Sequence, residues 1–256
     1  MERILLGVAI FVLVFFSITF AGYVKAYYDG QLVIQIAQQE VKAMETRAQQ
    51  GPAAADKSIQ EEITALQKRY EVDGQLKDRG IEVLKPEEIV NYKVAFVTNY
   101  GTIVVAFHPN GALMHGKKFL ALAANEVYNQ SFFHRIYADA VVFGGGPIRD
   151  EPDEYLADEI KLKHERGAVS LSNQGRTNTG SREFFICLKP IGDYDKKYSV
   201  FGYVDEGINV VEEMSRKAVI MNNFTKEKDC PAAEIKVVKV LVLKAPKNSQ
   251  EKNKSE

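Results

Sequence analysis

The feature that most constrains this chain is an uncharged apolar run near its start, residues 4–24, which reads ILLGVAIFVLVFFSITFAGYV. A helix of about 20 apolar residues is long enough to cross the hydrocarbon core of a bilayer. No face of the run is polar, so it does not fit a helix on the surface of a globular domain. The run therefore predicts a segment that enters a membrane or carries the rest of the chain across one.

Two interpretations of this run stay open, an uncleaved anchor and a cleaved secretory signal. The length of the run and the absence of a helix breaker favour an anchor, while residues 19–21 offer a candidate cleavage site. Arg3 precedes the run, and Lys25 and Asp29 follow it, a weak bias that places the start in the cytoplasm. We expect residues 1–27 to be a transmembrane anchor or a signal peptide of a single-pass membrane protein. Its soluble domain would then be extracytoplasmic, either periplasmic or lumenal.

The charge balance argues against nucleic acid as a partner. The chain has 33 basic and 34 acidic residues and a net charge of −1. The four histidines and two cysteines show no metal-ligand spacing, so neither a metal nor another cofactor is expected. Cys187 and Cys230 are expected to be buried apolar thiols, although an extracytoplasmic address would also permit a disulfide.

Residues 28–72 are predicted to form a helical stalk. Residues 31–50 contain neither glycine nor proline, and a second helical stretch covers 56–71. One apolar stripe on the second stretch is formed by Ile59, Ile63, Leu66 and Tyr70. The pattern fits a short coiled coil or a helical hairpin, with a protein partner or self-association through residues 31–71. It fits equally a stalk that packs on the next domain.

After a charged stretch at 73–90, expected to be a linker, the pattern changes to a period of two. Alternation over 92–97 and 103–107, around the turn residues 99–101, predicts a β-hairpin. Further β-type runs cover 132–136, 140–143, 168–171, 184–188, 199–204 and 235–243, and helical stretches cover 116–125 and 208–216. These elements predict a mainly β domain at 91–244, a closed barrel capped by two helices, followed by a disordered tail at 245–256.

A series of short motifs runs through this domain. They are YNQSFFHRI from Tyr128, FGGGP from Phe143, DE at 158–159, LKH at 162–164, GAVSLSN at 167–173, EFFI at 183–186 and YSVFG at 198–202. In this order the series resembles the cyclophilin family of peptidyl-prolyl cis-trans isomerases, over about residues 91–244. The resemblance implies an antiparallel eight-stranded barrel with a helix at each end, and rotation of X–Pro peptide bonds in polypeptide clients.

The implied chemistry needs neither a nucleophile nor a metal. Resonance in the peptide bond sets a barrier of about 18–20 kcal/mol, so a donor aimed at the prolyl nitrogen would weaken that resonance. The resemblance assigns this role to Arg135 of the FHR triplet, and an arginine stays charged and presents rigid donors. It assigns substrate binding to Val141, Phe143, Asn173, Glu183, Phe185, Tyr194 and Tyr198.

Several positions depart from the family pattern. Ala140 stands where a pocket phenylalanine is usual, and Phe143 replaces a glutamine that orients the arginine. Gly146 replaces an aspartate, Glu183 a glutamine, and Asp193 a tryptophan. The sequence therefore leaves two functions open. One is a membrane-tethered isomerase that assists the folding or assembly of extracytoplasmic proteins, and the other is a weak or inactive cyclophilin-fold scaffold in a membrane complex.

Overall fold

The computed structural model describes residues 51–146, 156–173, 182–222 and 226–244. Contacts divide the chain into two units, Met1–Asp56 and Lys57–Glu256, and the packing below lies within the second. The apolar run at 4–24, the helical stretch at 31–50 and the tail at 245–256 lie outside the described residues, so the predictions made for them stay predictions. Among the residues that are described, no helix has the length and hydropathy to cross a membrane.

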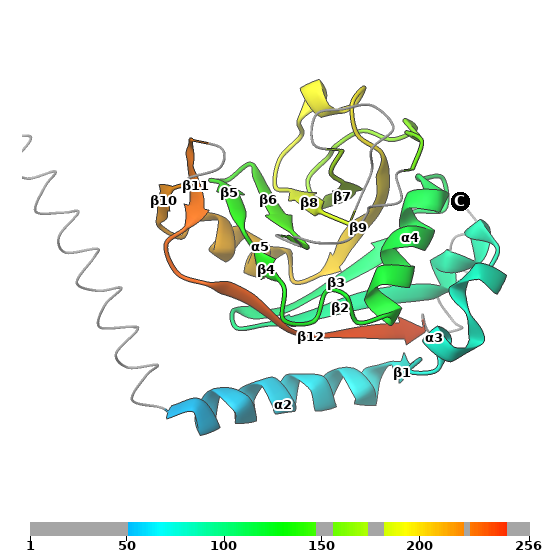
Figure 1. Ribbon diagram of the computed structural model, residues 1–256, viewed down its shortest axis with the longest axis horizontal. Helices are drawn as coiled ribbons and strands as arrows, with labels where there is room; N and C mark the ends of the chain where they lie inside the picture. The colour runs from blue at the N-terminus through cyan, green and yellow to red at the C-terminus, as the bar shows by residue number, and fades with distance from the viewer. Residues whose placement is uncertain (1–50, 147–155, 174–181, 223–225, 245–256) are drawn as a thin grey trace, which may run out of the picture. The chain divides into compact units, whose positions relative to one another are not determined.

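A ten-stranded antiparallel sheet dominates the structure (Figure 1). Its strands are β1 (Glu71–Val72), β2 (Tyr92–Thr98), β3 (Gly101–Phe107), β4 (Phe132–Phe133), β5 (Arg135–Tyr137), β6 (Val141–Gly144), β7 (Ala168–Leu171), β8 (Phe184–Cys187), β9 (Val200–Glu206) and β12 (Ile235–Lys244). They pair in the order β1-β12-β2-β3-β9-β7-β8-β6-β5, and β4 pairs with β12 off this path. The mainly β prediction is confirmed, and closure of the barrel stays a prediction.

The predicted strand at 132–136 is two strands rather than one. His134 separates β4 from β5, and the two strands pair with different neighbours, β4 with β12 and β5 with β6. One short segment therefore contacts strands from near both ends of the pairing order. Because His134 lies in this break, its side chain does not have to follow the alternation of a regular strand.

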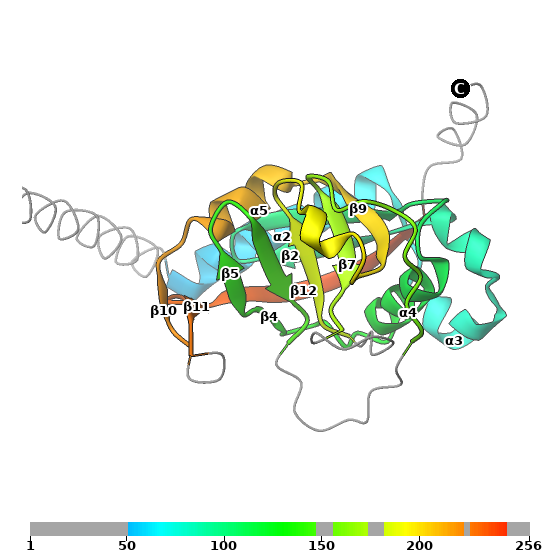
Figure 2. The same ribbon diagram turned by 90° about the horizontal axis from the view of Figure 1, so that it is seen from above.

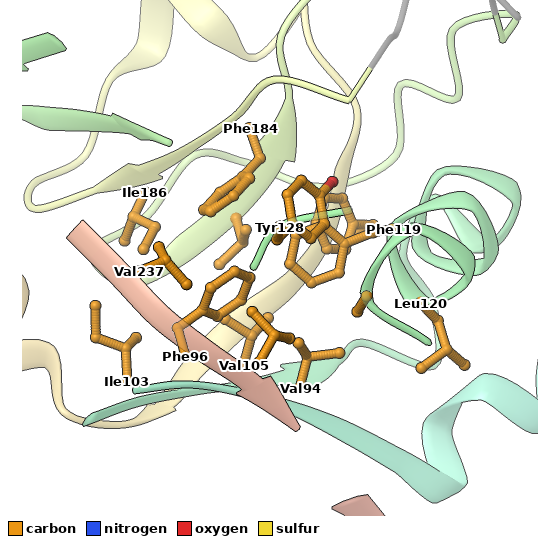
Figure 3. Packing of buried hydrophobic residues seen from close by; sticks show 14 of the residues in the cluster. Val94, Phe96, Ile103, Val105, Phe119, Leu120, Tyr128, Phe184, Ile186 and Val237 are labelled. Atoms are coloured by element: carbon orange, nitrogen blue, oxygen red, sulfur yellow. The ribbon is translucent and has the colours of Figure 1, made fainter. Parts of the chain in front are cut away.

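Aromatic side chains fill the centre of the core (Figure 3). Phe119, on helix α4 (Leu113–Ala124), has its ring centroid 5.8 Å from that of Phe96 and 5.3 Å from that of Phe184. Alternate residues of β2 and β3 face this core, as the period of two in the sequence predicts, while residues of the other face are buried in a separate cluster with Leu66. Both predicted helices are present, α4 and α5 (Ile208–Ser215), and they lie well apart (Figure 2).

The segment predicted to be a linker is packed into the domain. It contains α3 (Leu76–Arg79) and two 3₁₀ turns, η1 (Ile81–Val83) and η2 (Pro86–Asn91). Leu76, Ile81 and Ile89 are all buried in the main core. The expectation of a free linker at 73–90 is therefore corrected, because single apolar residues spaced among charges here enter the core.

From Lys57 onward, helix α2 (Gly51–Arg69) lies along the sheet (Figure 1), and its apolar stripe faces the sheet. Leu66 is buried against residues of β2, β3 and β12, with Ile59 and Ile63 packed beside it. Tyr70 donates a hydrogen bond of 2.6 Å to Glu206, which also pairs with Arg69. Leu66 is thus buried and the rest of the stripe is partly buried, so over residues 57–70 this segment packs on the following domain.

A small hairpin near the end of the domain was not foreseen from the sequence. Strands β10 (Val219–Met221) and β11 (Lys228–Pro231) form a separate two-stranded antiparallel sheet. Neither cysteine forms a disulfide in the described residues, since both Cys187 and Cys230 are free. Cys187 is buried as expected, and Cys230 is only partly buried.

Candidate functional site

Strand register brings the candidate catalytic arginine beside the candidate pocket residues. Arg135 on β5 pairs with Phe143 on β6, and Phe143 pairs in turn with Phe185 on β8. Directly paired residues on neighbouring strands have their Cβ atoms about 5 Å apart on one face of a sheet. Three positions that are distant in sequence therefore form one row across β5, β6 and β8.

The guanidinium of Arg135 lies over an aromatic ring. Its Cζ atom is 4.0 Å from the centroid of the Phe143 ring, a cation–π geometry. Its Nη2 atom is 4.0 Å from Oε2 of Glu183, beyond hydrogen-bonding distance. The side chain keeps 23% of its surface exposed. Arg135 is thus restrained by a ring and a carboxylate while part of it faces solvent.

The predicted pocket residues form a second hydrophobic cluster, apart from the main core. The ring of Phe185 packs 5.3 Å from that of Phe143, 5.5 Å from that of Tyr194 and 5.1 Å from that of Tyr198. Val141 belongs to the same cluster. The structure thus brings together Arg135, Val141, Phe143, Phe185, Tyr194 and Tyr198, although their roles in binding stay predictions.

Asn173 lies at the margin of this cluster. It is buried, and its side-chain amide donates a hydrogen bond of 2.7 Å to the carbonyl of Lys197. This bond ties the end of β7 to the segment that carries Tyr194 and Tyr198. The neighbouring loop at 174–181 lies outside the described residues.

The floor of the candidate pocket is closed. Phe185 is 0% exposed, Val141 is 1% exposed and Phe143 is 6% exposed. Phe143 occupies space beside Phe185, as expected if it refills volume lost at Ala140, which lies in the turn before β6 and outside the cluster. A proline ring can reach Phe185 only if a neighbouring aromatic side chain moves.

Sequence reasoning missed the partner that Glu183 makes. His134 Nε2 lies 2.8 Å from Oε1 of Glu183, within hydrogen-bonding distance. Burial raises the pKa of Glu183, but hydrogen bonds from His134 and Ser172 and the nearby charges of His134 and Arg135 outweigh it, so the pKa is lowered overall. The adjacent H and R of the FHR triplet are the only sequence signal for this contact.

A polar chain behind the pocket, buried at His164 and Ser170, was also missed. His164 Nδ1 lies 3.0 Å from Asp195 and its Nε2 lies 3.1 Å from Ser170 Oγ. Ser170 is 0% exposed, so it cannot act as a nucleophile on a bound polypeptide. The imidazole stacks on the ring of Phe185 at 5.8 Å, which supports the pocket from behind. Burial lowers the pKa of His164 in spite of Asp195, and this favours the neutral ring.

The hydroxyls around Arg135 stay protonated near neutral pH. Burial raises the pKa of Tyr137 to about 12, helped by its hydrogen bond to Glu227. Burial also raises the pKa of Tyr194 and of Tyr198. In the described part of the chain, no group of histidine, cysteine or acidic side chains could hold a metal ion. Arg135 and Glu183 form the charged pair at the site, with His134 beside them.

The fold is that of solved cyclophilin structures. A crystal structure of a cyclophilin type peptidyl-prolyl cis-trans isomerase of Cryptosporidium parvum is similar with a TM-score of 0.52 and 24% identity, covering 60% of this chain and 98% of that chain. Its structure in the presence of the dipeptide Ala-Pro gives a TM-score of 0.53 at 24% identity, covering 60% and 99%. The class of protein defined by the fold is therefore cyclophilin-like.

Sequence comparison then gives the family. The family described as "Cyclophilin type peptidyl-prolyl cis-trans isomerase/CLD" matches residues 93–242. Peptidyl-prolyl cis-trans isomerase-like 1 of Neurospora crassa is 34% identical over 160 residues, which cover 59% of this chain and 94% of that protein. An isomerase of Dictyostelium discoideum is 34% identical over 155 residues, 57% and 94% of the two chains. The chain belongs to the cyclophilin-type peptidyl-prolyl cis-trans isomerase family, a class of isomerase enzymes.

Proposed function

We propose that this chain is a membrane-tethered peptidyl-prolyl isomerase that acts on X–Pro bonds of extracytoplasmic proteins. The observation that carries the catalytic part is the position of Arg135, partly exposed above Phe143 and in one row with Phe185. The apolar run at 4–24 supports the tether, and its weak charge bias supports the extracytoplasmic address. The clients are proline-containing polypeptides during folding or assembly.

In this proposal, Arg135 acts as the donor to the prolyl nitrogen. As the peptide bond twists, the nitrogen loses its resonance with the carbonyl and becomes a better hydrogen-bond acceptor. A guanidinium held in a partly buried site strengthens that contact, because its field is less screened than in water. The aromatic side chains of Phe185 and Tyr198 hold the proline ring while the rest of the bond rotates. The backbone of Asn173 binds the preceding residue of the client.

A second candidate, a scaffold with weak or no turnover, is favoured by one observation. The floor residues Val141, Phe143 and Phe185 are all buried, so binding of proline requires rearrangement of aromatic side chains. That rearrangement would lower the apparent affinity by the fraction of molecules that are open. In a scaffold, the tether rather than the turnover would supply the biological effect, through a high local concentration.

An isomerase assay separates the two candidates. We expect the wild type to accelerate cis–trans exchange in an Ala-Pro peptide, followed by exchange NMR, and Arg135→Ala to lose about a hundredfold in kcat/KM. Arg166→Ala is the matched control, because Arg166 is an exposed arginine paired with Glu212 outside the site. Equal rates for wild type and Arg135→Ala would refute catalysis by Arg135. Peptide binding without any acceleration would favour the scaffold.

The tether is tested independently of the chemistry. We expect the full chain to remain with membranes after a carbonate wash, and a version lacking residues 1–27 to be released. A reporter fused to the carboxyl end should be active outside the cytoplasm. A cytoplasmic reporter would refute the proposed address while leaving the enzymatic proposal intact.

A further inference from the structure

His134 and Arg135 are consecutive residues, and both approach the same carboxylate. His134 Nε2 lies 2.8 Å from Oε1 of Glu183, and Arg135 Nη2 lies 4.0 Å from its Oε2. In an unbroken strand, consecutive side chains point to opposite faces and could not both reach one group. The strand is interrupted at His134, between β4 and β5. The interruption therefore allows the side chains of His134 and Arg135 to approach the same carboxylate.

A glycine makes room for the histidine. A Cβ atom added at Gly146 would lie 2.7 Å from Cε1 of His134, closer than real Cβ contacts, and within 3.1 Å of both ring nitrogens. The backbone of Gly146 is held in place by a β-bridge to Phe132. Any side chain at this position would have to displace the imidazole. The ring thus occupies a place that only glycine leaves free.

The contact of Glu183 with Arg135 is incomplete. At 4.0 Å the pair makes no hydrogen bond, whereas the contact of Glu183 with His134 does. The carboxylate has two oxygens; His134 holds one of them, and Ser172 also donates a hydrogen bond to the group. A carboxylate free to turn would approach the guanidinium to form a short ion pair, because arginine and carboxylate prefer close, bidentate geometry. Such a pair would occupy the donors that a client needs.

We propose that His134 is a positioning residue that holds Glu183 back from Arg135. In this arrangement the carboxylate lies near enough to orient the guanidinium above Phe143 and too far to occupy its donors. Gly146 belongs to the same unit, since it creates the space for the imidazole. The inference rests on the proposed function, because it assumes that Arg135 is the catalytic donor.

The arrangement predicts that one substitution rescues another. His134→Ala should leave the carboxylate held by Ser172 alone, so that it can turn to pair with Arg135 and lower kcat by about tenfold, while the KM for an Ala-Pro peptide changes little. Adding Glu183→Gln to His134→Ala should raise kcat at least about threefold above that of the single variant, because the amide carries no charge to capture the guanidinium. A histidine that only stabilised the fold would give no such recovery. His108→Ala is the matched control, a partly buried histidine beside Tyr203 and away from the site.

A second readout does not depend on turnover. The Nε of Arg135 is buried and, within the described residues, lacks a hydrogen-bond partner, so its N–H is suited to observation by ¹⁵N-arginine NMR. We expect the signal to shift in His134→Ala, as a short ion pair forms, and to return towards the wild-type position in the double variant. An unchanged signal in His134→Ala, or no recovery of kcat in the double variant, overturns the proposal. If the wild type has no isomerase activity, the proposed function is refuted. The NMR signal of Arg135 still tests whether His134 holds Glu183 away from it.

Discussion

Leu66→Ala tests whether helix α2 is part of the folded domain or a stalk that only precedes it. Leu66 is 4% exposed and contacts a cluster on the outer face of the sheet, formed by Ala95, Val97, Val104, Leu241 and Leu243. Alanine has the highest helix propensity, so the substitution removes packing without weakening the helix itself. Any loss of stability therefore reports the contact between α2 and the sheet.

The expected magnitude follows from the burial. Leucine-to-alanine changes in cores cost about 2–5 kcal/mol, and more where the cavity cannot collapse. Here the neighbours Ile59 and Ile63 are only partly buried, so the helix can settle and the cost should fall in the lower part of that range, about 2–3 kcal/mol. The folded unit has about 200 residues, for which each kcal/mol shifts Tm by about 2–4 °C. We expect Tm to fall by about 4–12 °C.

Thermal unfolding followed by circular dichroism on the full chain measures this shift. Gln67→Ala is the control, because Gln67 is exposed on the same helix and its replacement should change stability by less than about 0.5 kcal/mol. Isomerase activity at 25 °C should be unchanged in both variants, since β5, β6 and β8 do not contribute to this cluster. A Tm within 1 °C of wild type for Leu66→Ala would show that α2 does not stabilise the sheet.

Two further predictions concern titratable groups. The folded state lowers the pKa of Glu183, so its ionised form stabilises the fold above about pH 4.5 and that contribution is lost as pH falls through the lowered value. The gap in Tm between wild type and Glu183→Gln should therefore narrow on acidification, and a constant gap would contradict this. Burial raises the pKa of Cys187 to about 12, so iodoacetamide at neutral pH should label the partly buried Cys230 first, as read by mass spectrometry. Faster labelling of Cys187 would refute its burial.

The elements that sequence predicted best have a single dominant cause. Alternate residues of β2 and β3 face the main core and those between them include the residues buried under α2, and the period of two is visible without tertiary information. Leu76, Ile81 and Ile89 show the opposite case. Each is an isolated apolar residue among charges, so no local period marked it as buried. Their burial depends on where α3 and the two 3₁₀ turns meet α4, which is a tertiary property.

The same division holds for the site. Motif order was enough to predict that Arg135, Phe143 and Phe185 would meet, and the strand register brings them together. The contact between His134 and Glu183 could not be predicted, because it depends on a break between two strands that the pattern showed as one. Closure of the pocket floor was also hidden, since it results from how several aromatic rings share one volume.

Strand β12 joins the end of the domain to its beginning, pairing with β1, β2 and β4. A ribosome delivers the chain from its amino end, so β2 emerges long before the strand that completes its hydrogen bonding. Until residues 235–244 appear, one edge of β2 carries unpaired backbone groups and can recruit strands from other molecules. The domain is therefore open to edge-to-edge association until its last strand is synthesised.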